Sequence, residues 1–277
     1  MTAQLLFYDR VTPISTRSHG DVSIESGTHY GFARGVNSVP LTAVEIPRAS
    51  REYSIVFAGQ EEVVPVVILG IEGNANLYVT EDGKWDAQYV PAFVRRYPFV
   101  FSRSEDGGTF TLCLDESFEG LNREGRGQRL FDDGGERTPY LENVLGFLQE
   151  YQNHFLRTRA YCAKLKELDL LEPMQAQFRL ADGAQRSLTG FQAVSRERLK
   201  ALPAEKLAEL AKTDELELTH VHLNSMNNFS LMLERVAAGR TVASTPDDPA
   251  AITTEAEGAD AAPKEAAPAK KKRRTTH

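Results

Sequence analysis

The first 118 residues carry short apolar runs of the kind that form strands. Runs such as YSIVFAG (53–59) and VVPVVILGI (63–71) alternate with clusters of Gly, Asn and Asp. β-Branched and aromatic residues favour strands, and the Asp-Gly pairs within 81–84 and 105–108 favour turns between strands. No helical pattern of ten or more residues separates these runs. We therefore expect a mostly antiparallel β-structure over residues 1–118.

Apolar residues at helical spacing begin after a polar connection over residues 119–138. Thr138 can cap a helix and Pro139 suits its first turn, so we expect a long helix from Pro139 to about residue 169. The connection is rich in Gly, and a loop of its length is often a lid or a binding loop. Its GRGQRL stretch (125–130) lacks the third glycine of a dinucleotide fingerprint, so phosphate binding there is not favoured.

The remainder of the chain predicts a hairpin, helices and a tail. Two alternating segments around ADGA predict a β-hairpin over 174–194, and short helices follow over 195–237. From residue 239 the composition becomes Ala, Pro, Thr, Glu and Lys, which cannot bury a core, so we expect a disordered tail over 239–277. The chain is thus expected to be α+β, with one domain over 1–238 in which the β-rich part packs with the long helix, the hairpin and the C-terminal helices.

The composition is that of a globular protein, with 277 residues, 41% of them hydrophobic, and a net charge of −7. The acidic balance gives no general attraction to nucleic acid or to an anionic membrane. Nucleic-acid binding is suggested only by the Lys270–Arg274 run, for which a solvated tail is favoured. Neither a signal peptide nor about 18 consecutive apolar residues is present, so we expect a soluble, cytoplasmic protein without membrane insertion.

Sequence motifs for catalysis or metal binding are absent, and we predict no catalytic residue, no metal site and no cofactor. His220 and His222 would share a face on a strand, but their segment has a helical pattern, where they lie about 200° apart. Cys113 and Cys162 stand in apolar surroundings and are expected to be free and reduced.

Residues 84–101, KWDAQYVPAFVRRYPFVF, are the strongest candidate for a binding site. Pro91 and Pro98 bracket a short predicted helix, on which Arg95 and Arg96 fall opposite an apolar face that includes Val94. The first interpretation is an aromatic-flanked cationic patch for a carboxylate, a phosphate or an acidic partner loop.

The second interpretation, which we favour, pairs both arginines with the protein's own acids, such as Asp86 or those in SREY (50–53) and LDE (114–116). The candidate contact residues for a ligand or a partner are Arg95, Arg96, Arg51, Trp85 and Tyr97.

Several long stretches also suggest a family. VNSVPL (36–41), ASREYSIVF (49–57), DGKWDAQYVPAFVRRYPF (82–99) and LFDDGGERTPYLENVLGFLQEY (130–151) resemble the SapC family of bacterial proteins, and the likeness runs over roughly residues 7–236. The family is named for a protein encoded beside surface-layer secretion components. Members also occur beside cupin-like proteins, tryptophan-halogenase-like proteins and TonB-dependent receptors. The resemblance carries over no catalytic residue and no cofactor.

Two functions follow from these expectations. The first is a soluble, non-catalytic accessory or binding protein linked to surface-layer export or TonB-dependent nutrient uptake, with an unknown protein or a small anionic ligand as its partner. The alternative is an enzyme, or an enzyme subunit, acting on a small anionic or sugar-derived metabolite, with the 119–138 loop closing over the arginines. A pocket that joins Arg95 or Arg96 to Asp115, Asp132 or a histidine would support the alternative.

Overall fold

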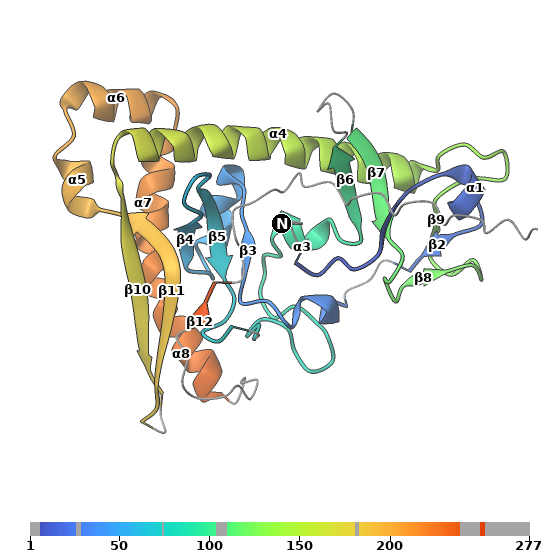
Figure 1. Ribbon diagram of the computed structural model, residues 1–277, viewed down its shortest axis with the longest axis horizontal. Helices are drawn as coiled ribbons and strands as arrows, with labels where there is room; N and C mark the ends of the chain where they lie inside the picture. The colour runs from blue at the N-terminus through green and yellow to red at the C-terminus, as the bar shows by residue number, and fades with distance from the viewer. Residues whose placement is uncertain are drawn as a thin grey trace, which may run out of the picture.

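One long helix runs along the top of three small sheets in the computed structural model (Figure 1). The structure describes residues 6–25, 29–73, 75–103, 110–180, 183–238 and 250–252. Mixed helices and antiparallel sheets confirm the α+β prediction. The expected turn at 105–108 and the run at Lys270–Arg274 lie outside the described residues.

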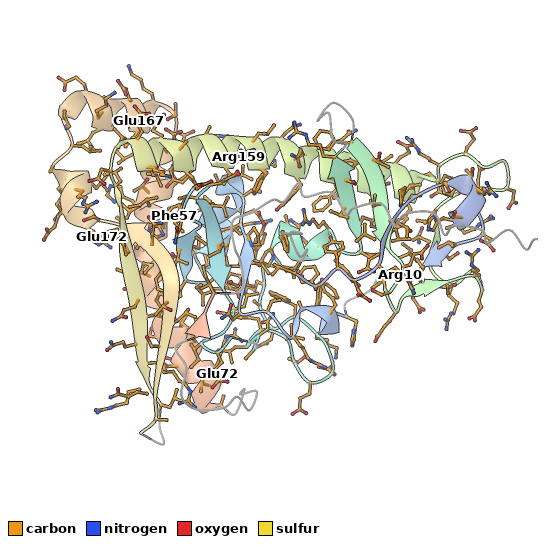
Figure 2. All side chains as sticks on the ribbon, in the orientation of Figure 1. Arg10, Phe57, Glu72, Arg159, Glu167 and Glu172 are labelled. Carbon is orange, nitrogen blue, oxygen red and sulfur yellow. The ribbon has the colours of Figure 1, made fainter. Side chains whose placement is uncertain are left out.

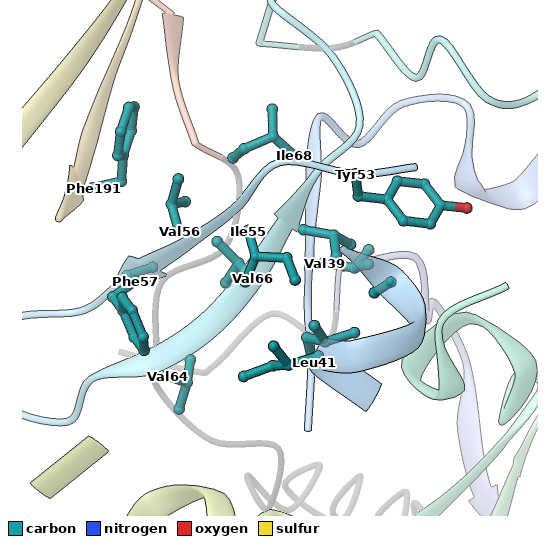
Figure 3. Close-up of a cluster of buried hydrophobic side chains, with 14 of the residues drawn as sticks. Val39, Leu41, Tyr53, Ile55, Val56, Phe57, Val64, Val66, Ile68 and Phe191 are labelled. Atoms are coloured by element: carbon teal, nitrogen blue, oxygen red, sulfur yellow. The ribbon is translucent and has the colours of Figure 1, made fainter. Parts of the chain in front are cut away.

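The largest sheet holds most of the apolar runs of the first part of the chain. Its strand order is β10-β11-β4-β5-β3, and β12 pairs with β11. The strands are β3 (Ser38–Pro40), β4 (Ile55–Ala58), β5 (Val64–Ile68), β10 (Leu171–Arg179), β11 (Gln185–Val194) and β12 (Ala250–Ala251). Every residue of β4 and β5 is buried, which explains why these runs do not alternate with polar residues. Figure 3 shows Ile55, Val66 and Ile68 packed in this core.

Two three-stranded sheets complete the β-structure. One has the order β1-β7-β6 and the other β8-β2-β9. Their strands are β1 (Val11–Pro13), β2 (Ser23–Ile24), β6 (Phe99–Arg103), β7 (Phe110–Asp115), β8 (Leu121–Asn122) and β9 (Gln128–Arg129). Part of the 119–138 connection is therefore built into a sheet, at the opposite end of the molecule from the β10–β11 hairpin (Figure 1).

Eight α-helices and three 3-10 turns occur among the described residues. They are α1 (Thr16–His19), η1 (Gly31–Ala33), η2 (Ala43–Glu45), α2 (Ile46–Ala49), α3 (Ala92–Arg95), α4 (Pro139–Glu167), α5 (Arg196–Lys200), α6 (Ala204–Lys212), α7 (Glu215–Ser225), η3 (Met226–Asn228) and α8 (Phe229–Ala237). No helix in the described ranges is both long and apolar enough to cross a membrane.

Helix α4 starts where the sequence predicts and joins two apolar cores. The Thr138 hydroxyl accepts a hydrogen bond from Leu141 N at 3.4 Å. Leu141 and Leu148, in the first half of the helix, pack with the β6–β7 sheet. The second half packs on the large sheet, and Figure 2 shows Phe57 of that sheet in the interior beneath α4, with Arg159 along the helix. Helix α3 lies beneath α4, between the large sheet and the β6–β7 sheet (Figure 1).

Helix α7 closes the other side of the large sheet through a buried histidine. His222 Nε2 accepts from Val194 N at 3.1 Å, and Nδ1 donates to Ile55 O at 2.9 Å. Burial lowers the pKa of His222 to about 4, a hydrogen bond to the Ile55 carbonyl opposes this, and Arg196 adds to the lowering. His222 is thus a neutral bridge between β11 and β4, whereas His220 is exposed on the same helix.

A short strand within the predicted tail was not expected. Residues Ala250–Ala251 pair in parallel with Leu188 and Thr189 of β11, and Ile252 is buried. The rest of the predicted tail lies outside the described residues. Both cysteines are free and buried, as expected.

Candidate functional site

Helix α3 is held in place by one buried carboxylate. Glu45 Oε1 accepts hydrogen bonds from Tyr89 Oη and Ala92 N, both at 2.7 Å. Its Oε2 accepts from Thr42 N at 2.8 Å and from Thr42 Oγ1 at 2.7 Å. An anion at the start of a helical turn is also favoured by the backbone dipoles. Glu45 therefore fixes where Arg95 and Arg96 emerge from the turn.

The residues before α3 are tied to the large sheet by a second network. Glu52 accepts from Gln88 N at 2.9 Å and from Tyr89 N at 3.0 Å. Tyr53 Oη donates to Tyr89 O and accepts from Trp85 Nε1, the latter at 2.8 Å. Trp85 is half-buried and its ring stacks on Tyr78. The structure thus gives Trp85 a role in packing.

A pocket of about 320 Å³ lies beside α3, where the first half of α4 passes the β6–β7 sheet. Its described lining comes from several separate segments and is made up of His29, Tyr30, Phe32, Val94, Arg95, Arg96, Tyr97, Pro98, Phe99, Phe118, Tyr140, Asn143, Val144 and Phe147. This lining carries two arginines and no carboxylate. An anion is the ligand that such a lining favours electrostatically.

Arg96 is the least expected member of the lining, because its side chain is only 3% exposed. Its Cζ lies 4.1 Å from the ring centre of Phe93, 5.2 Å from that of Tyr151 and 5.8 Å from that of Tyr8. Nε and Nη2 have no hydrogen-bond partner among the described residues. The guanidinium is therefore a buried cation surrounded by rings.

Tyr8 does not neutralise this cation. Burial raises the pKa of Tyr8 to about 12, even though the adjacent Arg96 lowers it, so the phenol remains protonated at neutral pH. The phenol donates its proton to Phe99 O at 2.8 Å. Within the described part of the chain no ion pair involves Arg96. Its charge thus has no neutralising partner in those residues.

Arg95 is exposed and supplies the second charge. Its Nε donates to Val90 O at 3.0 Å, and its Cζ lies 5.2 Å from the ring centre of Phe147 and 5.9 Å from that of Tyr89. In the described ranges this is the hydrogen bond that the Arg95 side chain makes. The Nη1 and Nη2 groups thus form a fork available for a carboxylate or a phosphate.

Tyr97 lines the pocket next to a carboxylate that stays outside it. Asp115 is buried and accepts from Asp9 N at 2.9 Å, Arg10 N at 3.0 Å and Ser117 Oγ at 2.6 Å. Burial raises its pKa, but these hydrogen bonds outweigh burial, so the net pKa is lowered. Tyr97 Oη donates to Asp115 at 3.5 Å. Asp115 is thus an ionised anchor for the N-terminal segment.

Among the described residues, neither arginine forms an ion pair with the acids that the favoured interpretation named. Asp86 pairs instead with Arg235 of α8, at 2.7 Å. Glu52 and Asp115 are used by backbone N–H groups. The predicted placement of Arg96 opposite the apolar face is wrong, because Arg96 is buried and its guanidinium lies against Phe93 of that face.

The five predicted contact residues separate into two groups. Arg95, Arg96 and Tyr97 meet in the pocket, whereas Arg51 and Trp85 are not part of its lining. Arg51 is exposed after α2. A role for each in binding stays a prediction.

Several lining residues were missed from the sequence. One face of the long helix carries Tyr140, Val144 and Phe147 at i, i+4 and i+7. This spacing could have been used to predict from the sequence that the three side chains lie together. His29 and Phe32 stand in a segment without a clear pattern, and only the fold brings them here. No described residue of 119–138 lines the pocket, so the closure of this loop over the arginines, which the alternative function would use, is not seen in this structure.

The family assignment rests on most of the chain. The model of the SapC family matches residues 14–232. The chain belongs to the SapC family. None of the curated proteins and none of the solved structures compared with it gives a match. The segment that carries Arg95 and Arg96 falls inside the matched range.

Proposed function

We propose that this SapC family member is a non-catalytic binding protein that takes a small anionic ligand in the pocket beside Arg95 and Arg96. It would act in the cytoplasm as an accessory to surface-layer export or to TonB-dependent nutrient uptake, with an as yet unknown protein partner. The pocket supports the ligand, whereas the cellular role rests on the family resemblance alone.

Arg96 carries the proposal. A buried guanidinium with two nitrogen atoms lacking hydrogen-bond partners is costly, and proteins normally pair such a charge. The pocket that Arg96 lines contains a second arginine and no carboxylate among its described residues. An anionic ligand would supply the missing negative charge in a partly dehydrated site, where the attraction is stronger than in water.

The test is a calorimetric titration with small carboxylates and inorganic phosphate, comparing the native protein with Arg95→Gln. Loss of a charge-assisted hydrogen bond predicts an affinity lower by about tenfold or more. Arg51→Gln is the matched control, since it removes an exposed arginine that does not line the pocket. Equal affinity in Arg95→Gln and the native protein, or an equal loss in both variants, would contradict the proposal.

A second candidate function has one observation in its favour. The pocket joins Arg95 to His29, an exposed imidazole that could act as a general base toward a bound anion. An enzyme or enzyme subunit acting on a small anionic or sugar-derived metabolite would use this pair. Here His29→Gln would keep ligand affinity and lose turnover, followed by NMR of the ligand over hours. A ligand left unchanged by the native protein would exclude this candidate for that ligand.

A further inference from the structure

We infer that the ligand of the pocket is a compact aromatic carboxylate, which the pocket holds by its ring and by its charge. This inference rests on the proposed anion-binding function and names the class of the anion. It is carried by three features of the lining: the number and arrangement of the rings, the free fork of Arg95, and the scarcity of other polar groups.

Aromatic rings supply seven of the fourteen described lining residues, and aliphatic side chains supply only two valines and a proline. The rings already contact one another. Phe32 and Tyr97 lie 4.1 Å apart between ring centres, and Tyr97 and Phe118 lie 5.5 Å apart at 88°. Edge-to-face and offset contacts of this kind can be extended to a further ring. A flat aromatic group therefore matches these walls better than a flexible alkyl chain.

The charged end of the site has a planar geometry. Phe147 lies beneath the Arg95 guanidinium, which leaves the Nη1 and Nη2 edge for a ligand. A carboxylate can accept two parallel hydrogen bonds from such an edge. Arg96 adds a buried positive charge nearby. A carboxylate attached to a ring would place its charge at the arginines while its ring contacts the aromatic wall.

The remaining polar groups argue against a ligand rich in hydroxyls. Apart from the arginines and tyrosine hydroxyls, the described lining offers only His29 and Asn143. A sugar needs hydrogen bonds for most of its hydroxyls, because each one buried without a partner costs free energy. The volume of about 320 Å³ is at the lower end of the range for small-molecule sites, so the ligand must be compact.

Three probes of nearly the same size separate charge from aromaticity: benzoate, benzamide and cyclohexanecarboxylate. Each is titrated into the full-length protein by calorimetry. Benzoate should bind most tightly. Benzamide, which lacks the charge, should bind at least about tenfold more weakly. Cyclohexanecarboxylate, which lacks the aromatic ring, should bind about fivefold more weakly.

A variant links the ring preference to this pocket. Phe147→Leu keeps apolar bulk on α4 and removes one ring, so benzoate affinity should fall to near that of cyclohexanecarboxylate, which should itself change little. Phe110→Leu is the control, since Phe110 is an exposed ring outside the pocket. An unchanged benzoate preference in Phe147→Leu would overturn the inference.

The outcomes distinguish the class of the ligand from anion binding as such. If benzoate and cyclohexanecarboxylate bind equally well, and Arg95→Gln weakens both, the aromatic class is wrong and anion binding stands. If none of the three probes binds but inorganic phosphate does, the aromatic class is again wrong and anion binding stands. If benzamide binds as tightly as benzoate, or if phosphate fails as well, the anion-binding function itself is contradicted.

Discussion

Replacing Arg96 by Met should stabilise the fold while removing the ligand site. Met has a length and flexibility close to those of the arginine stem, and its sulfur makes favourable contacts with aromatic rings. The rings of Phe93, Tyr151 and Tyr8 already surround this position. The Arg96→Met variant can therefore keep the packing and lose only the charge and the N–H groups.

The expected size of the effect follows from the surroundings of Arg96. Two buried nitrogen atoms without described partners, Nε and Nη2, cost about 1–3 kcal/mol each. Three cation–ring contacts return about 0.5–2 kcal/mol each, and Met recovers part of this through its own ring contacts. We therefore expect Arg96→Met to raise the free energy of unfolding by about 1 kcal/mol. Residues that serve binding often lower the stability of the fold in this way.

The assay is urea unfolding followed by the fluorescence of Trp85, the only tryptophan in the chain. Arg235→Met is the contrast, because Arg235 pairs with Asp86 at 2.7 Å and its loss should lower the free energy of unfolding by about 1–3 kcal/mol. Breaking a buried ion pair usually costs about 3–5 kcal/mol. A loss of that size in Arg96→Met would show that Arg96 has a structural counter-ion, and would refute the reasoning.

Two further predictions concern the large sheet. The pKa of His222 is lowered from 6.5 to about 4 in the fold, so the unfolded chain binds the proton first on acidification. The contribution of neutral His222 to the free energy of unfolding is therefore fully present above pH 6.5, and up to about 3 kcal/mol of it is lost between pH 6.5 and 4. In His222→Gln the free energy of unfolding, measured at several pH values, should change much less over this range. Ile252→Asp should detach β12, which hydrogen exchange would report as faster exchange at β11 residues that pair with it, by at least about tenfold. Unchanged pH dependence in the first variant, or unchanged exchange in the second, would contradict the corresponding structural role.

The sequence predicts the elements that depend on local pattern. Thr138 and Pro139 mark the start of α4, and the structure ends this helix at Glu167, two residues before the predicted end. The hairpin of β10 and β11 is predicted because its strands are adjacent in the chain. Gly83, in the turn predicted at 81–84, has a φ of +79°, which Gly adopts without strain.

Long-range pairing is what the local pattern could not predict. Strand β1 pairs with β7 through Val11 and Asp115, and nothing near either residue specifies the other. The burial of Arg96 was missed for a related reason. A helical period assigns faces only when the helix has several turns, and α3 has one, so distant elements decide which side chains it covers. The pocket likewise depends on Phe32, Arg95 and Phe147 meeting from three parts of the chain.

The most direct test of the anion site is an NMR titration that follows the side-chain Nε–Hε signals of the arginines as benzoate is added. The account predicts that the signals of Arg95 and Arg96 shift together and saturate with one affinity, while that of Arg51 does not move. Signals of Arg95 and Arg96 that stay in place, or a uniform small drift of all arginine signals, would contradict a ligand site in this pocket.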